Sequence, residues 1–452
     1  MLEVAWSIAA FIVALGVLVS FHEFGHFWVA RRLGVKVLRF SVGFGRALWL
    51  RRGADGVEYV IAAVPLGGYV KMLDEREGEV APVEAHRAFN RQNVWKRIAI
   101  VAAGPLANFL MAVVAYWIVF VVGIAGYRPL VGQPPAGSIA AQAGLQRGDE
   151  VVSINGEPAP TFGALRTVVI DRALAGETLE LAARRDGATR AVTLPLGAAR
   201  LDPEHLFEDL GIRQYWPAGP LMVVRVEPGT SAEQAGLKAG DRVLRQNGVA
   251  LDDLDQWRDW IAARAGQVVE FEVERGGEAT RLTAILSARE HDGRRIGYLG
   301  AAVRVDVPPA IWENLGTKHR LSVWAALPAA AAETARMSLL TLKFLYRMVL
   351  GDVSVKNISG PIQIAQFAGY TASSGLVSFL FFIAIMSVSL AVLNLLPVPV
   401  LDGGHLLYYV VELVKGSPLS DRAQAVGQQV GLTLLVALMG LAFYNDILRL
   451  ID

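Results

Sequence analysis

Four long apolar runs set the narrowest limit on what this chain of 452 residues can fold into. Each run meets or approaches the ~20 apolar residues that a helix needs to cross a hydrocarbon core of ~30 Å. The hydrophobic fraction of 53 % and the mean hydropathy of +0.39 fit a membrane protein better than a soluble one. We therefore predict a polytopic α-helical membrane protein with four transmembrane helices, at residues 4–21 extending to 30, 98–123, 376–400 and 426–448.

The charges that flank the first two runs predict the orientation of the chain. Lysine and arginine residues are dense between residues 28 and 97, whereas Glu3 is the only charged residue before the first run. Basic loops stay on the cytoplasmic side, so we expect the N-terminus and residues 126–375 on the exterior side. The first run opens with Glu3 rather than a basic region and shows no small-residue cleavage site, so we expect a retained helix rather than a signal peptide.

The composition excludes several kinds of chemistry. The net charge is +1 and no long basic stretch occurs, so nothing in the sequence favours nucleic acid as a partner. The sequence contains no cysteine, which removes thiolate catalysis, cysteine metal ligands and disulfides. Any bound metal must therefore be held by histidine or carboxylate side chains.

The exterior segment contains an internal repeat. The stretch GSIAAQAGLQRGDEVVSING (residues 137–156) aligns with GTSAEQAGLKAGDRVLRQNG (229–248) at a constant offset of 92 residues. Each copy predicts a short helix, a glycine turn and a strand that ends in an Asn-Gly turn. Both copies resemble the bacterial, circularly permuted PDZ fold, so we expect two tandem PDZ-like α+β domains at residues 127–218 and 220–306. They could bind exterior peptides or trimmed substrate ends by strand addition, act as bulky gates, or serve only as stable β-rich spacers.

Two further segments are expected close to the membrane. Residues 56–72, GVEYVIAAVPLGGYVKM, contain two β-prone runs around Pro65 and a glycine pair, which is typical of a β-hairpin in the cytoplasmic loop. This hairpin could dip into the membrane and offer an unpaired edge, or it could be small and self-contained. Residues 333–351 are amphipathic, so we expect the segment 307–375 to form interfacial helices rather than a span.

The first apolar run ends in the motif His-Glu-Phe-Gly-His. Its spacing places His22 and His26 one helical turn apart on the same face, with Glu23 beside them. Ionisable side chains inside a membrane helix cost several kcal/mol each, so a cluster of three needs a compensating partner. A bound metal with trapped water would supply that partner. The alternative is that these side chains only extend to the cytoplasmic interface.

A third metal ligand must come from elsewhere in the chain. Catalytic zinc sites use three protein ligands and keep one position open for water. The stretch NLLPVPVLDGGH, Asn394 to His405, ends the third apolar run, and the predicted topology puts it on the same membrane face as the two histidines. We therefore expect Asp402 to be the third ligand, with His405 as a weaker candidate.

The His-Glu-x-x-His motif and the Asn-x-x-Pro-x-Pro-x-x-Asp-Gly motif of residues 394–403 together resemble the site-2 protease family of intramembrane zinc metalloproteases. Two exterior PDZ-like domains between the second and third spans narrow this resemblance to the bacterial branch that serves the sigma-E envelope stress response. The stretches GHFWVARR, PLGGYVKMLDE and VPVLDGGH also stand where that branch carries them. The resemblance therefore covers essentially the whole chain.

The roles of the site residues follow from chemistry and agree with what the resemblance implies. Zinc (Zn2+) on the three ligands would activate water and polarise the scissile carbonyl. Glu23 would take the proton from water and pass it to the leaving amine. Asn394 could donate a hydrogen bond to the substrate or, alternatively, cap a broken helix. The resemblance also suggests a substrate-binding group near the cleaved bond, made of Gly67, Gly68 and Tyr69.

The sequence thus predicts a zinc-dependent endopeptidase of the bacterial inner membrane that cleaves single-span membrane proteins near the cytoplasmic side, with its PDZ-like domains in the periplasm. The resemblance implies a pre-trimmed transmembrane anti-sigma factor as substrate, and remnant signal peptides as another class. The competing hypothesis is a membrane-anchored PDZ scaffold whose metal site is structural or vestigial. A metal transporter is disfavoured because the other spans lack a chain of polar residues. The two spanning regions should occupy residues 1–126 and 376–452.

Overall fold

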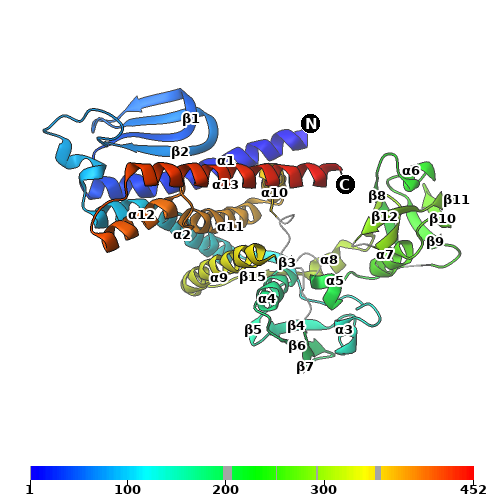
Figure 1. The fold of residues 1–452 in the computed structure, drawn as a ribbon. Helices are drawn as coiled ribbons and strands as arrows, with labels where there is room; N and C mark the ends of the chain where they lie inside the picture. The colour runs from blue at the N-terminus through cyan, green and yellow to red at the C-terminus, as the bar shows by residue number, and fades with distance from the viewer. Residues whose placement is uncertain (1, 197–205, 251, 292–293, 352–357, 452) are drawn as a thin grey trace. The chain divides into compact units, whose positions relative to one another are not determined.

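The computed structural model describes residues 2–196, 206–250, 252–291, 294–351 and 358–451. The chain folds as two compact units, one made of Met1–Ile124 with His319–Asp452 and the other of Ala125–Lys318. Figure 1 shows the elements of both units. The first unit holds the long apolar helices, and the second holds the sequence repeat.

Four of the described helices are long and apolar enough to cross a membrane. The third of them ends at Leu395, earlier than expected, because Pro397 and Pro399 follow and cannot continue a helix. The first three pack together through small and aliphatic side chains, whereas the last is mostly exposed. The four are α1 (Leu2–Arg32), α2 (Val94–Val122), α11 (Leu376–Leu395) and α13 (Asp421–Ile451).

The amphipathic stretch at residues 333–351 belongs to a longer helix. This helix, α9 (Val323–Leu350), packs against α2 through small buried side chains that include Ala330. It is not among the candidate spans of the described residues, and its expected place at the membrane interface stays a prediction. The remaining elements of this unit are η1 (Ala85–Arg87), η2 (Phe89–Arg91), α10 (Pro361–Ser373), which packs on α1, and α12 (Asp402–Lys415).

The prediction that residues 56–72 form a hairpin by themselves is wrong. They form one bent strand, β2 (Glu58–Met72), which pairs antiparallel with β1 (Val37–Arg52). Register irregularities bend both strands, so Phe40 of β1 faces Tyr59 on one side and Val70 on the other. The sheet consequently has four strand segments, in the order 47–52, 58–62, 37–42 and 68–72. The segment 68–72 lies at one edge of this sheet. The hairpin prediction was wrong because it did not include the β-prone run 37–52, which is the pairing partner.

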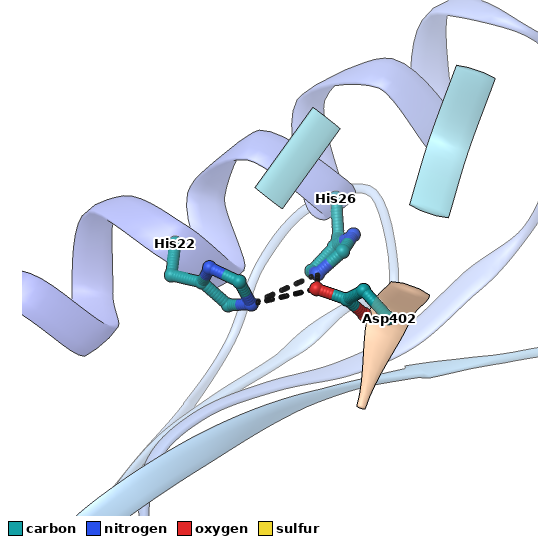
Figure 2. Close-up of side chains that lie close together, drawn as sticks. All are labelled: His22, His26 and Asp402. Carbon is teal, nitrogen blue, oxygen red and sulfur yellow. Dashed lines mark hydrogen bonds and ion pairs between the residues drawn. The ribbon is translucent and has the colours of Figure 1, made fainter. Parts of the chain in front are cut away.

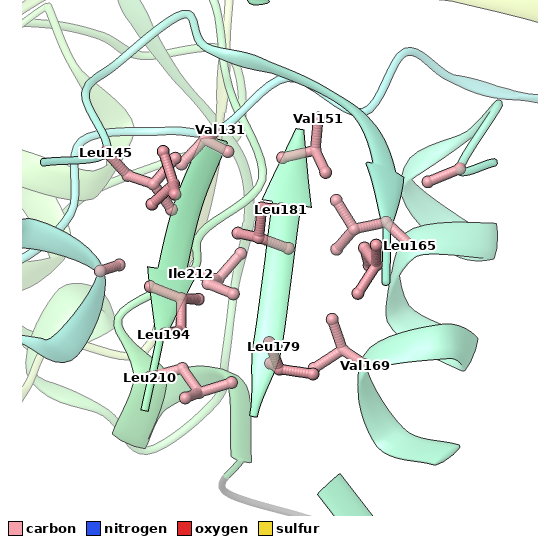
Figure 3. Packing of buried hydrophobic residues seen from close by; sticks show 14 of the residues in the cluster. Val131, Leu145, Val151, Leu165, Val169, Leu179, Leu181, Leu194, Leu210 and Ile212 are labelled. Atoms are coloured by element: carbon pink, nitrogen blue, oxygen red, sulfur yellow. The ribbon is translucent and has the colours of Figure 1, made fainter. Parts of the chain in front are cut away.

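The second unit repeats one structural pattern twice, at the offset seen in the sequence. The first copy contains α3 (Ile139–Gln142), β4 (Glu150–Ile154), β5 (Glu157–Pro158), α4 (Phe162–Leu174), β6 (Leu179–Arg185), β7 (Ala188–Leu194) and α5 (Leu206–Leu210). Its sheet has the order β5-β4-β6-β7, and Figure 3 shows the aliphatic core between sheet and helices.

The second copy contains α6 and β9 at the positions equivalent to α3 and β4. Asn155 and Asn247 end the two equivalent strands with φ values of 47° and 46°, the left-handed conformation that an Asn-Gly hairpin turn requires. The sheet of the second copy has the strand order β11-β10-β9-β8-β14 and packs over a hydrophobic core of its own. The elements are β8 (Leu221–Val226), α6 (Ser231–Gln234), β9 (Arg242–Gln246), α7 (Leu254–Ala262), β10 (Val268–Arg275), β11 (Glu278–Ile285), β12 (Ser287–His291), β13 (Arg294–Tyr298) and β14 (Ala301–Val305).

Two short strands connect the ends of this segment. Strand β3 (Ile124–Tyr127) pairs with β15 (Gly316–His319), which follows α8 (Pro309–Leu315). The backbone amide of Arg128 also donates to the carbonyl of Leu315 at 2.8 Å. The chain therefore enters and leaves the second unit at neighbouring points.

An ion pair fixes the Gly-Asp turn of each copy. Asp241 is 1 % exposed and accepts hydrogen bonds from the Lys238 backbone amide and, twice, from Arg275. Asp149 and Arg185 form the same pair in the first copy. Burial of the Asp241 carboxyl by itself raises its pKa, but the Arg275 and Lys238 hydrogen bonds outweigh burial and hold the pKa below its ordinary value.

Replacing Arg275 by Met should destabilise the second copy, because Asp241 stays buried without its cation. We expect the free energy of unfolding of this region to fall by about 2 kcal/mol. Hydrogen–deuterium exchange of residues 229–248 in the full-length protein measures this loss. Arg281→Met is the control, since Arg281 is 76 % exposed and lies 3.5 Å from Glu270, a pair worth about 0–1 kcal/mol. Equal effects of the two substitutions would contradict the account.

The same pair predicts a pH dependence. The folded-state pKa of Asp241 lies below its unfolded value of about 4, so its stabilisation is complete above that value and is lost as the pH falls through the folded pKa. The difference in unfolding free energy between the parent and Arg275→Met should therefore be largest near pH 7 and shrink as the pH falls. Acid first protonates the Asp241 carboxyl of the variant, whose pKa burial raises, and then the paired carboxyl of the parent. A difference that grows on acidification would contradict this sign.

Candidate active site

The motif at the end of the first span converges with Asp402 on one point. His22 and His26 on α1 are each 9 % exposed, and their Nε2 atoms lie 3.3 Å apart. Oδ2 of Asp402, the first residue of α12, lies 3.1 Å from Nε2 of His22 and 3.5 Å from Nε2 of His26. Figure 2 shows the three side chains meeting from two segments far apart in the chain. Within the described part of the chain they form the one group of side chains suited to a metal ion.

The spacing of these three atoms fits zinc. With bonds of about 2.0–2.1 Å, neighbouring ligands of a tetrahedral zinc stand about 3.3 Å apart. The observed separations of 3.1, 3.3 and 3.5 Å bracket that value. Asp402 Oδ2 is buried and has no hydrogen-bond partner among the described residues, which suits an atom that serves a cation. Three protein ligands leave the fourth position for water or substrate, as in catalytic rather than structural zinc sites.

A tight loop between α11 and α12 places Asp402. A Cβ on Gly403 would stand 2.2 Å from the carbonyl oxygen of Leu396, and one on Gly404 would stand 2.5 Å from that of Val398. Val400 has a φ of 93°, which a β-branched residue adopts only when its surroundings enforce it. The loop therefore doubles back on α12 so closely that only glycine fits after Asp402.

Helices α1 and α2 touch where the ligands stand. A Cβ on Gly25 would lie 2.2 Å from the Ala103 carbonyl oxygen, so the two backbones approach as closely as glycine allows. Opposite, a Cβ on Gly104 would lie 2.2 Å from His26 Nε2 and 2.9 Å from His22 Cε1. The absent side chain of Gly104 thus leaves the space that both imidazoles fill.

The outer ring nitrogens of the two histidines also contact α2. His26 Nδ1 lies 2.9 Å from the carbonyl oxygen of Ile100, and His22 Nδ1 lies 3.2 Å from the side-chain amide of Asn108. Asn108 is fully buried, and its backbone carbonyl accepts a hydrogen bond from Ser387 of α11 at 2.8 Å. Both imidazoles are therefore held on the side away from Asp402.

Glu23 stands outside the ligand group but beside it. It lines the same cavity of about 580 Å³ as the three ligands. The edge segment of β2 passes over it, because a Cβ on Gly68 would lie 3.0 Å from Glu23 Cγ and 2.7 Å from the Ser41 carbonyl oxygen. A carboxylate so placed can reach a water molecule or substrate in the cavity without binding the metal.

The structure brings most of the other expected site residues into this cavity. Asn394, Gly68 and Tyr69 line it, as does His405, which is not part of the ligand group. Gly67 does not line it; its open side faces the ring of Phe44, 2.3 Å from where a Cβ would stand.

The sequence prediction missed the residues that hold this site in shape. The Ile100 carbonyl and Gly104 carry no side-chain signal at all, whereas Asn108 is a lone amide in an apolar helix and could have been noticed. Arg97 of α2 also forms an ion pair of 2.6 Å with Glu412 of α12 in the cavity wall. Its guanidinium lies 4.8 Å from the centre of the Tyr409 ring, so this pair ties α12 to α2 beside the ligands.

Two histidines and an aspartate on membrane-type helices, with an open ligand position and a glutamate in the adjoining cavity, define an intramembrane zinc metalloprotease. A scaffold with a structural metal is not favoured, because such sites are closed by a fourth protein ligand.

Comparison with known proteins places the chain in a family. Peptidase family M50 matches residues 10–438, and the chain belongs to this family. It is 44 % identical over 457 residues to the regulator of sigma-E protease RseP of Escherichia coli (strain K12), with 100 % of both chains covered. It is 43 % identical over 457 residues to protease RseP of Yersinia pestis, again over 100 % of both. A protein of Xylella fastidiosa (strain Temecula1 / ATCC 700964) named as a zinc metalloprotease is 45 % identical over 443 residues, 97 % of each chain.

Gly104→Ala should remove zinc from the purified protein, because the added methyl group occupies the position of His26 Nε2. We expect the zinc content to fall at least tenfold, and cleavage to fall with it. Gly16→Ala on α1 is the control, since a Cβ there meets no atom within 4 Å. Elemental analysis of both variants after identical purification makes the comparison. Full zinc content in Gly104→Ala would show that the ligands do not occupy the positions described.

Proposed function

We propose that this zinc metalloprotease cleaves single-span membrane proteins near the cytoplasmic face of a bacterial inner membrane. The observation that carries the proposal is the meeting of His22, His26 and Asp402 in a cavity that Glu23 also lines. The orientation rests on the basic loop between the first two spans. The names of the relatives support a regulatory role in the sigma-E response. We further propose a pre-trimmed transmembrane anti-sigma factor as the substrate, with remnant signal peptides as a further class.

Each site residue has a distinct task in this proposal. His22, His26 and Asp402 would hold the zinc, which would supply an activated water and a Lewis acid for the scissile carbonyl. Glu23 accepts the proton of the attacking water and delivers it to the leaving amine. Asn394 lines the cavity, where its amide can donate a hydrogen bond to the substrate carbonyl as negative charge develops there.

Glu23→Gln tests the assignment of the general base. The substitution keeps the size of the side chain but removes the proton acceptor, so we expect the rate constant for cleavage of a single-span reporter to fall by at least 10²-fold. Zinc content should not change, because Glu23 is outside the ligand group. The assay uses purified protein in detergent with equal zinc loading of the parent and the variant. Retained cleavage at full zinc content would remove Glu23 from this role.

The substrate backbone needs new partners when its helix unwinds for cleavage. The edge segment 68–72 of β2 pairs with β1 on one side only. Its residue Gly68 lies against Glu23, and both Gly68 and Tyr69 line the cavity. We propose that an extended stretch of substrate adds to this edge, next to the metal. Gly67 would contribute through its φ of 135°, which bends β2 where it enters the cavity wall.

Met72→Pro should therefore reduce substrate cross-linking and cleavage by at least tenfold. The Leu73 amide donates to Lys36, so the Met72 amide points to the open edge beside the cavity, and proline cannot donate a hydrogen bond there. Zinc content should stay unchanged. Leu48→Pro is the matched control, since Leu48 is 71 % exposed and belongs to the opposite edge segment of the same sheet. Equal losses in both variants, or no loss in Met72→Pro, would argue against strand addition at this edge.

The two repeat copies are proposed to be PDZ-like domains at residues 127–218 and 220–306 that face the periplasm. Support comes from the helix, turn and strand of each copy and from the two sheets with separate cores. We further propose that they exclude substrates with large exterior domains. The alternative role is recognition of trimmed substrate ends, which could bind to these domains by strand addition.

Excision of the repeat tests the exclusion proposal. The pairing of β3 with β15 brings both ends of the segment together, so residues 129–314 can be replaced by a short Gly/Ser linker. The shortened enzyme should cleave an untrimmed single-span substrate at least tenfold faster than the parent does, and a trimmed substrate at a similar rate. Unchanged discrimination between the two substrates would contradict an excluding role.

A further inference from the structure

The tautomer of one ligand histidine is determined by its partner on α2. His26 Nδ1 lies 2.9 Å from the backbone carbonyl oxygen of Ile100, and a carbonyl oxygen can only accept a hydrogen bond. His26 therefore carries a proton on Nδ1, which leaves Nε2, on the side of Asp402, as the nitrogen that can bind a metal. Ligand histidines in metal sites almost always donate their outer N–H to such an acceptor, which fixes the ring and raises its basicity.

The other ligand histidine faces a side chain instead of a carbonyl. Asn108 is 0 % exposed, and the amide atom 3.2 Å from His22 Nδ1 is Nδ2. Its Oδ1 is buried without a hydrogen-bond partner among the described residues. When Nε2 of His22 binds a metal, Nδ1 carries the proton and is a donor, so it cannot bond to Nδ2. Half a turn of the amide puts Oδ1 in that place and supplies the acceptor.

We propose that Asn108 is a positioning residue of the metal site. Its Oδ1 accepts the Nδ1 proton of His22, holds the imidazole in the tautomer that binds zinc, and keeps Nε2 aimed at Asp402. This inference rests on one part of the proposed function, namely that zinc binds at His22, His26 and Asp402. It adds a residue outside the ligand set whose effect on zinc binding can be measured without catalysis.

The surroundings of Asn108 support this task. Its backbone carbonyl accepts a hydrogen bond of 2.8 Å from Ser387, which is itself 0 % exposed on α11. Helix α11 leads directly into the loop that places Asp402. The acceptor for His22 and the third ligand are thus anchored to the same helix. A purely space-filling Asn108 would not need its amide beside the ring nitrogen of a ligand.

Zinc affinity separates the positioning role from simple packing. The experiment compares the full-length protein in detergent with Asn108→Leu, which keeps similar volume without an acceptor, and Asn108→Asp, which keeps the acceptor. Thr334→Val is the matched control, because Thr334 is a buried polar residue of the same unit whose hydroxyl donates to the Ala330 carbonyl of its own helix. Two quantities are measured: the zinc dissociation constant by competition with a chelator, and the unfolding midpoint of the metal-free protein.

We expect Asn108→Leu to raise the zinc dissociation constant by about 10–100-fold, with Asn108→Asp and Thr334→Val within threefold of the parent or tighter. The metal-free unfolding midpoint of Asn108→Leu should stay close to that of the parent. Equal zinc affinities of the parent and Asn108→Leu would overturn this inference and leave the proposed function intact. Equal weakening by Leu and Asp would also overturn it, in favour of packing. A parent without zinc affinity would overturn both this inference and the proposed function.

Discussion

The close approach of α1 to α2 is the contact on which the rest of the site depends. Without side chains at Gly25 and Gly104, the two helices bring the motif histidines against the backbone of α2. Ile100 and Asn108 can then hold the outer ring nitrogens, and the inner ones face Asp402. A wider helix separation would leave two imidazoles in an apolar bundle without partners, at a cost of several kcal/mol.

Elsewhere in this helix bundle, buried charges and free backbone amides are paired with each other. Asp446 of α13 is 2 % exposed and accepts hydrogen bonds from the amides of Gly360, Ile362 and Gln363 at the start of α10. Such bonds satisfy the free amides at the partly buried N-terminus of α10. The cavity beside the ligands differs, because Asp402 Oδ2 has no hydrogen-bond partner among the described residues. A metal ion and water are therefore expected beside Asp402 Oδ2, where a buried acceptor lacks a hydrogen-bond donor.

The sequence was sufficient to predict which side chains meet at the candidate metal site, because chemistry fixes their residue types and spacing. His22, Glu23 and His26 were predictable because one helical turn separates the two ligands, and Asp402 because cysteine is absent and prolines end the third span. The pairing of β2 was not predictable from residues 56–72, since its partner β1 lies outside them. Gly104 and the Ile100 carbonyl were equally hidden, because a missing side chain and a backbone oxygen leave no pattern in the sequence.

The central claim is that α1 and the start of α12 together form one zinc site. Zinc K-edge X-ray absorption of the purified parent and of Asp402→Ala, each loaded with one equivalent of zinc, tests it most directly. The account predicts two imidazole ligands and oxygen donors at about 2.0–2.1 Å in the parent, and loss of bound zinc in Asp402→Ala. An unchanged spectrum in Asp402→Ala, or a parent spectrum without imidazole scattering, would contradict it.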